Sequence, residues 1–209
     1  STVTTLAANT WYKTAEIEPE INFTANGKLY VVTGDGTNLS EIIESMPLSV
    51  KERAGRYKKE DDRKKSFICY NLLKNALEND YGISSFELLF SSQGKPYLKD
   101  RNDIFFSISH SKKCCVCVIS DRETGVDAEE IKPFSQRLAE KVCSENELRE
   151  IEKSPDKARE FTKIWTRKES FIKMTGEGFS HGLKEADTTK KKFFSEEREG
   201  LFISVCESE

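Results

Sequence analysis

Four short apolar segments follow one another in the middle of this chain and constrain its fold more than any other feature. They are rich in β-branched, aromatic and cysteine residues, and polar or glycine-containing links separate them. Such segments are typical of neighbouring strands joined by turns. The chain is therefore expected to contain a β-sheet made of residues 86–91, 104–109, 114–120 and 124–129.

Helical patterns flank this sheet along the chain. Ser49 and Glu52 have the spacing of a capping box, and a helical region is predicted from there to about Asp80, ending before Gly82. After the sheet, three helices are predicted. The first spans 134–142, the second begins at another capping box formed by Ser144 and Glu147, and the third spans 158–175 and ends at Gly176. Short strands are expected at 29–32, closed by a turn at 34–36, and at 193–194 and 201–206.

The order strand, helix, strands occurs twice along the chain. This repetition predicts an α+β fold made of two similar α/β lobes. The lobes are expected to span residues 29–107 and 108–209, the second carrying the metal site described below. Residues 1–28 show no sustained period and are predicted to be an N-terminal extension, either an appended strand or a loose tail.

Composition is that of an ordinary soluble protein. With 33 Lys and Arg against 36 Asp and Glu, the net charge of -3 is too small to indicate nucleic-acid binding. No apolar run reaches the roughly 20 residues of a membrane helix, and the N-terminus lacks the basic-then-apolar order of a signal peptide. A cytoplasmic location without membrane association is the expectation.

The six cysteines do not have the spacing of a zinc site. Three of them, Cys114, Cys115 and Cys117, cluster on one predicted strand, and the chain has only two histidines. Zinc sites favour C-x2-C pairs or mixtures of Cys and His. The cysteines are predicted to be reduced and buried, with Cys115 and Cys117 on one face of their strand.

Acidic residues end the last of the four strands. Because side chains alternate along a strand, Asp127 and Glu129 share one face, whereas Ala128 and Glu130 take the other. Two carboxylates on one face repel each other unless a cation lies between them, and hard oxygen ligands suit Mg²⁺ or Mn²⁺. The alternative is a solvated edge strand with scattered acids.

A helix about forty residues later carries the second group of charges. Apolar residues from Phe161 to Ile172 recur with the 3.6-residue period and bury one side of it. Glu169 and Lys173, four residues apart, meet on one edge. Taken alone, this pair could equally be a surface ion pair worth a few tenths of a kcal/mol.

The two groups together resemble the signatures of the 4'-phosphopantetheinyl transferases of the surfactin-synthetase-activating (Sfp) type. Those signatures have the form G-[IV]-D-x-E and W-[ST]-x-K-E-[SA]-x-x-K, and here they stand at 125–129 and 165–173. The family's G-K-P turn is similar to residues 94–96, its S-H-S strand end to 109–111, and its basic helix to 56–66. The resemblance covers roughly residues 29–182, and the segment from 182 to 201 is shorter than is usual in the family.

The resemblance implies a fold, a reaction and a metal site. The fold is that of two pseudo-twofold-related lobes with the active site in the cleft between them. The reaction moves the phosphopantetheine arm of coenzyme A to a serine of an apo acyl or peptidyl carrier protein and releases adenosine 3',5'-bisphosphate. Asp127, Glu129 and Glu169 are implied to hold Mg²⁺, or Mn²⁺, and Glu169 to act as general base, while Lys168 and Lys173 neutralise phosphate oxygens.

Coenzyme A carries several phosphate charges, so its site needs local basic residues. Residues 51–65 contain eight Lys and Arg against four acids, although such a run is often only a solvated helix face. Glu147 also corresponds to an acid near the family's site, but its capping box is a sufficient local reason for it. The coenzyme A contacts carried over by resemblance are Arg53, Lys65, Ser66, Lys95, Ser109 and His110, with His110 as a cation on the 3'-phosphate.

Two other functions compete with the transferase interpretation. A non-catalytic module that binds coenzyme A or a carrier protein needs no base, so the complete set of acids disfavours it. Nucleic-acid binding through residues 51–65 lacks interleaved aromatics and a recognisable motif. The sequence favours a monomeric enzyme and does not identify the carrier.

Overall fold

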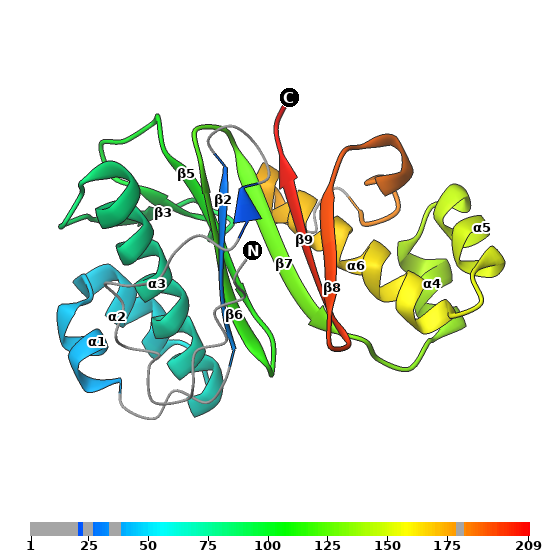
Figure 1. The fold of residues 1–209 in the computed structure, drawn as a ribbon, viewed down its shortest axis with the longest axis horizontal. Helices are drawn as coiled ribbons and strands as arrows, with labels where there is room; N and C mark the ends of the chain where they lie inside the picture. Colours follow the sequence, from blue (N-terminus) through cyan, green and yellow to red (C-terminus); the bar gives the residue numbers. More distant parts are fainter. Residues whose placement is uncertain (1–20, 23–26, 34–38, 179–181) are drawn as a thin grey trace.

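The apolar strands in the middle of the chain lie back to back between two helical layers (Figure 1). The structure, a computed structural model, describes residues 21–22, 27–33, 39–178 and 182–209. The expected turn at 34–36 and residues 1–20 lie outside the described residues. The elements are β1 (Ile21–Asn22), β2 (Lys28–Thr33), α1 (Ser40–Ser45), α2 (Leu48–Gly55), α3 (Glu60–Tyr81), β3 (Leu88–Phe90), β4 (Pro96–Leu98), β5 (Phe105–His110), β6 (Cys114–Ser120), β7 (Thr124–Glu130), α4 (Gln136–Val142), α5 (Glu145–Lys153), α6 (Lys157–Thr175), a 3-10 turn η4 (Thr188–Lys190), β8 (Phe194–Arg198) and β9 (Leu201–Glu207).

The strands form antiparallel sheets whose apolar faces meet. Within the described residues, one sheet has the order β1-β2-β6-β5, another the order β7-β9-β8, and β3 pairs with β4 as a hairpin. Helix α3 covers the outer face of the first sheet, and α6 covers that of the second (Figure 1). The prediction of a mixed α and β fold is therefore confirmed.

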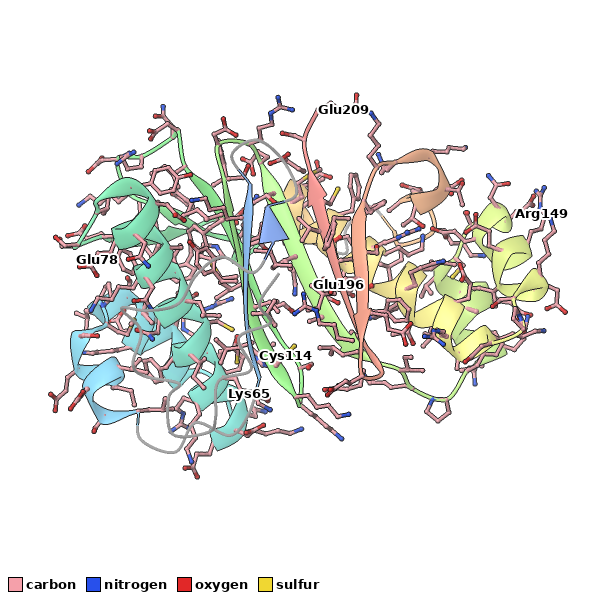
Figure 2. All side chains as sticks on the ribbon, viewed as in Figure 1. Lys65, Glu78, Cys114, Arg149, Glu196 and Glu209 are labelled. Carbon is pink, nitrogen blue, oxygen red and sulfur yellow. The ribbon has the colours of Figure 1, made fainter. Side chains whose placement is uncertain are left out.

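The buried cysteines follow the predicted alternation along β6. Cys115 and Cys117 face α3, whereas Cys114 lies in the apolar core between the two sheets (Figure 2). All six cysteines are buried and unpaired thiols. Their role as small core residues is thus confirmed, and burial raises the pKa of the Cys114 thiol to about 12.

The helix ends obey local chemistry. Gly82 and Gly176 adopt left-handed conformations, with φ of 67° and 70°, and cap α3 and α6 as predicted. The predicted capping box of Ser144 and Glu147 is present at the start of α5. The single helix expected from residue 49 to Asp80 is instead two helices, because three acids at 60–62 stand in the first turn of α3, where the helix dipole favours negative charge.

Pairing partners decided the details that local patterns missed. β4 extends the expected turn at 93–96 into a strand that pairs with β3, and α1 had no predicted counterpart. Ile21 and Asn22, within the expected N-terminal extension, pair with β2. The expected boundary between residues 107 and 108 falls inside β5. β5 and β6 belong to the same sheet as β2, and the chain passes to the second sheet in the link at 121–123.

Among the helices that the structure describes, none combines the length and apolarity needed to cross a membrane.

Gly125 sets the close approach of β7 to α6. A Cβ atom at this position would lie 1.9 Å from the Ser170 carbonyl oxygen and 2.5 Å from the Met174 backbone nitrogen. Backbone atoms cannot rotate away, so Gly125→Ala is expected to force the helix off the strand and lower the free energy of unfolding by about 3 kcal/mol. Denaturant unfolding measures this. Gly55→Ala, where a Cβ meets nothing within 4 Å, is the matched control; equal midpoints for the two variants would contradict the prediction.

Candidate active site

Asp127 on β7 is held in place by hydrogen bonds from β5 and α6. Ala128 packs with Val126 in the core between the sheets, which confirms the predicted alternation and leaves Asp127 on the α6 face. Asp127 is buried, and its Oδ1 accepts hydrogen bonds from Ser109 Oγ at 2.9 Å and Lys173 Nζ at 2.8 Å. Its other oxygen, Oδ2, is buried and has no hydrogen-bond partner within the described part of the chain.

Lys173 closes a triangle of polar groups. Its Nζ also donates to Ser109 Oγ at 2.8 Å, so β5, β7 and α6 meet at Ser109, Asp127 and Lys173. The Lys173 side chain keeps one third of its surface exposed, while that of Asp127 keeps only 6%. An ammonium group that is tied to a buried carboxylate and still open to solvent can exchange partners with an incoming anion.

Glu169, one helical turn before Lys173, is a carboxyl group in a carboxylate-rich environment. Burial, the charge of Asp127 and, to a smaller extent, that of Glu129 raise its pKa, Lys173 lowers it, and the net result is a pKa of about 7. A carboxyl group with a pKa near neutrality is suited to general base or acid catalysis at physiological pH. Asp127 and Glu129 thus lie close enough to Glu169 for their charges to raise its pKa.

The carboxylates fit a hard divalent cation by donor chemistry. Oxygen ligands are those that Mg²⁺ prefers, and the buried, unpartnered Asp127 Oδ2 is the atom most in need of a cation. Glu129 is paired with Lys132 at 2.8 Å. No three His, Cys, Asp or Glu side chains of the described residues are grouped closely enough to form a complete ligand set.

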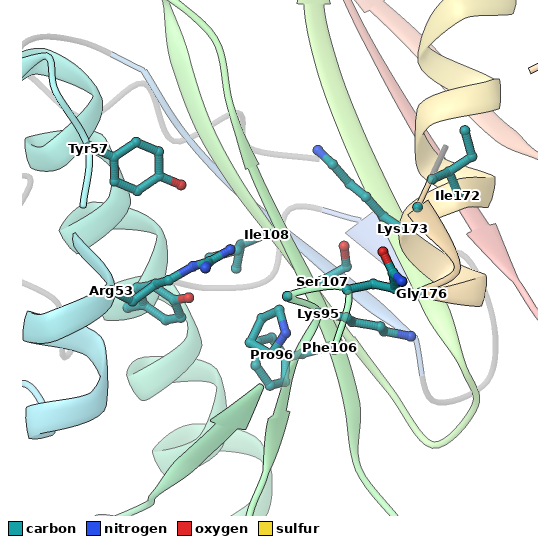
Figure 3. A pocket seen from close by; sticks show the side chains of 14 residues that line it. Arg53, Tyr57, Lys95, Pro96, Phe106, Ser107, Ile108, Ile172, Lys173 and Gly176 are labelled. Atoms are coloured by element: carbon teal, nitrogen blue, oxygen red, sulfur yellow. The ribbon is translucent and has the colours of Figure 1, made fainter. Parts of the chain in front are cut away.

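A cavity of about 230 Å³ opens beside this cluster (Figure 3). Its cationic lining comes from three separate parts of the chain: Arg53 of α2, Lys95 before β4, and Lys173 of α6. Arg53 lies over the Phe90 ring, 5.4 Å from its centroid. Lys95 Nζ bonds to Glu123 Oε2 and to the Met174 carbonyl, both at 2.5 Å, so it also ties its turn to the end of α6. Positive charge from three directions suits a polyanionic ligand.

The remaining predicted coenzyme A contacts lie beyond this lining. His110 packs edge-to-face on Tyr57 at 6.2 Å, and burial lowers its pKa, so its neutral form is favoured without an anion beside it. Lys65 is largely buried on α3 and pairs with Asp61 at 2.6 Å, and Ser66 is buried. In the structure none of Lys65, Ser66 and His110 is among the described residues that line the cavity.

Lys168 does not face the cavity, which corrects the role inferred from its motif. Its ammonium is fully buried and pairs with the equally buried Glu147 at 2.7 Å. It also donates to the carbonyls of Leu183 and Ala186 at 2.7 and 2.8 Å. A group enclosed in this way cannot reach a phosphate, because every contact it makes is internal. Glu147 therefore has a second role beyond its capping box.

Glu130 is not simply solvated, although it lies on the face predicted for it. Its Oε1 accepts a hydrogen bond at 2.9 Å from the backbone nitrogen of Lys113, in the link between β5 and β6.

The cavity is also lined by residues that the sequence patterns did not indicate. Tyr57 and Tyr70 line it, yet the sequence signals only a core face for Tyr70 and nothing for Tyr57. An aromatic within a basic run is the signal that could have indicated Tyr57.

Carboxylates beside a cavity lined by cations are suited in chemistry to phosphate groups. Residues 123–202 match the 4'-phosphopantetheinyl transferase superfamily. The chain is 30% identical over 157 residues to 4'-phosphopantetheinyl transferase psf-1 of Bacillus pumilus, covering 71% of this chain and 67% of that protein. The chain belongs to the 4'-phosphopantetheinyl transferase superfamily.

Two relatives from Bacillus subtilis point to the same family. A 4'-phosphopantetheinyl transferase is 33% identical over 134 residues, and 4'-phosphopantetheinyl transferase Sfp of strain 168 is 31% identical over 134 residues. Each alignment covers 62% of this chain and 60% of the relative. The chain thus spans about 60% of the length of these two relatives, and the resemblance to the Sfp type noted in the motifs is confirmed.

Proposed function

We propose that this protein transfers the 4'-phosphopantetheine arm of coenzyme A to a serine hydroxyl of an apo acyl or peptidyl carrier protein, releasing adenosine 3',5'-bisphosphate. The observation that carries the proposal is the triangle of Ser109, Asp127 and Lys173, with Glu169 beside it and a cation-lined cavity opening from it. The similarity to proteins named 4'-phosphopantetheinyl transferases supports the same activity.

The reaction is a displacement at the β-phosphorus of the coenzyme A pyrophosphate. The serine oxygen forms the new P–O bond, and the bridging oxygen leaves with the adenosine bisphosphate. Glu169, with its pKa near 7, takes the serine proton. Arg53, Lys95 and Lys173 neutralise phosphate oxygens and hold the pyrophosphate in line.

Asp127, Glu129 and Glu169 are the residues proposed to hold Mg²⁺, with Mn²⁺ as a possible substitute. When bound, the ion supplies positive charge for the phosphoryl oxygens. Asp127 supplies the buried oxygen that has no protein partner among the described residues, so a cation there would also relieve the cost of burying it. Ser109 and Lys173 fix the orientation of that carboxylate.

Four features inferred from the sequence remain proposals. These are the pseudo-twofold relation between the lobes, the active-site cleft between them, the monomeric state and the cytoplasmic location. When each lobe is defined by its own sheet, the division falls in the link at 121–123. Ser109 then belongs to the first lobe, and Asp127 and Lys173 belong to the second. The lobes would then meet at the site.

Glu169→Gln is expected to lower the rate of transfer about 100-fold or more, because the amide cannot accept the serine proton. Transfer of a labelled pantetheine arm from coenzyme A to apo carrier proteins, with Mg²⁺ and above pH 7, measures this. Glu130→Gln is the matched control, since a glutamine oxygen still accepts from the Lys113 nitrogen and the residue faces away from the site.

Equal rates for Glu169→Gln and the wild type would refute the role of Glu169 as base. Coenzyme A binding by calorimetry without turnover on any apo carrier would instead favour a binding module.

A further inference from the structure

A row of polar residues crosses the second sheet beneath α6. Ser204 of β9 is the register partner of Asp127 on β7 and of Ser195 on β8. Directly paired residues of antiparallel strands point to the same face, so the three side chains stand side by side under the helix. Thr166 and Ser204 are fully buried. A polar row under a helix is costly unless each group is hydrogen-bonded.

The hydroxyls in this row form a chain with one direction. Thr166 Oγ1 donates to the Lys163 carbonyl at 2.9 Å and lies 2.8 Å from Ser204 Oγ. Since a hydroxyl has one proton, Ser204 must be the donor to Thr166. Ser195 Oγ, 3.1 Å from Ser204 Oγ, is then the donor to Ser204, and it accepts from Arg167 Nε at 2.9 Å. Each of the three hydroxyl protons in this series of hydrogen bonds then has one acceptor, which for Ser195 is Ser204 Oγ by the same rule.

This chain fixes α6 to the sheet at a second point. Thr166, Glu169 and Lys173 are three and four residues apart and share one face of the helix. Lys173 ties that face to Asp127, and Thr166 ties it to Ser204, the cross-strand neighbour of Asp127. Glu169 lies between the two points. While both ties are intact, the helix segment that carries Glu169 is held against the sheet of β7 and β9 at both of its ends.

We propose that Thr166 and Ser204 are positioning residues that hold Glu169 in register with Asp127 while Lys173 exchanges partners. This inference rests on the proposed transferase function, in which Lys173 turns from Asp127 to a phosphate oxygen. That exchange removes one polar tie between α6 and β7. Neither Thr166 nor Ser204 lines the cavity, so a ligand there does not compete for their hydrogen bond.

The test compares Thr166→Val, which keeps the shape but removes the acceptor that α6 offers to the Ser204 hydroxyl, with Thr166→Ser, which keeps the hydroxyl. Thr166→Val is expected to lower kcat about 100-fold, the cost of a small misplacement of a catalytic group, with little change in the KM for coenzyme A. Thr166→Ser should restore kcat. The double variant Thr166→Val with Ser204→Ala should be no worse than Thr166→Val, because both act through one bond.

The matched control is Thr124→Val, which removes a fully buried hydroxyl from β7, the strand that carries Asp127. Thr124 Oγ1 donates to the Cys206 carbonyl at 3.1 Å, away from α6. It should lower the Tm with kcat unchanged. If Thr166→Val lowers the Tm but leaves kcat at the level of Thr124→Val, the hydroxyl chain contributes only stability and the proposal is overturned.

Amide hydrogen exchange of α6 tests the same tie without any turnover. Residues 166–175 should exchange faster in Thr166→Val than in Thr166→Ser or Thr124→Val. If the wild type transfers to no carrier, the proposed function fails, and the exchange rates still decide whether Thr166 and Ser204 hold the helix. Unchanged exchange across the three variants would remove the positioning role.

Discussion

Asp127→Asn is expected to reduce kcat/KM by about 1,000-fold while leaving the protein folded. Asparagine keeps the shape of the side chain and an oxygen that can accept from Ser109 and Lys173, but it removes the charge at the centre of the site. The loss combines a weaker metal ligand with a misdirected Lys173, and electrostatic groups of this kind are each worth roughly 100- to 1,000-fold. Steady-state transfer to an apo carrier measures the effect.

The Tm of Asp127→Asn should differ little from that of the wild type. Asp127 is buried, its charge raises the pKa of the nearby Glu169, and only one of its oxygens is hydrogen-bonded within the described residues. Removing that charge relieves repulsion and offsets the weakened bond to Lys173. A Tm close to that of the wild type, together with the loss of transfer, separates a functional carboxylate from a structural one.

Asp187→Asn provides the matched contrast at a buried aspartate outside the site. Burial alone raises its pKa, but hydrogen bonds from Thr189 and Asn146 outweigh this and lower it to about 2, so its ionised form stabilises the fold. The expected result is a lower Tm with transfer retained. If Asp127→Asn behaved in the same way as Asp187→Asn, Asp127 would be a structural residue and the proposed site would be wrong.

Periodicity could predict which way each acid of β7 faces, because strand geometry is local. Ala128 lies in the core between the sheets, and Asp127 meets Lys173 on the other side, as alternation requires. Helical spacing similarly placed Glu169 and Lys173 on one edge of α6. Glycine conformations at 82 and 176 ended the helices where the sequence indicated.

Long-range partners could not be predicted from the same patterns. Lys168 adjoins Glu169 in sequence, and nothing local shows that its ammonium is covered by carbonyls from Leu183 and Ala186. Likewise, β6 follows β3 and β4 in the chain but pairs with β2 on one side and with β5 on the other, since register depends on which apolar faces meet. Arg53 and Lys95 were assigned by resemblance, and only the fold brings them to one cavity with Lys173.

Lys168→Met is expected to lower the free energy of unfolding by about 3–5 kcal/mol, the usual cost of leaving a buried charge without its partner. Glu147 would keep its bonds from the backbone of Ser144 and Thr188, but its charge would be uncompensated, and the carbonyls of Leu183 and Ala186 would lose their donor. For a domain of this size the Tm should fall by roughly 6–20 °C. Thermal and denaturant unfolding measure both quantities.

The double variant Glu147→Gln with Lys168→Met separates charge from packing. Glutamine keeps one acceptor for the backbone donors around it, and methionine fills much of the volume of the lysine, so much of the lost stability should return once neither charge remains. A phosphate-binding Lys168 would behave in the opposite way: Lys168→Met would raise the KM for coenzyme A, as Lys173→Met is expected to do, with little change in Tm. Because the Lys168 ammonium is fully buried and the Lys173 side chain is one-third exposed, the pair of substitutions compares a structural cation with a ligand-facing one on the same helix.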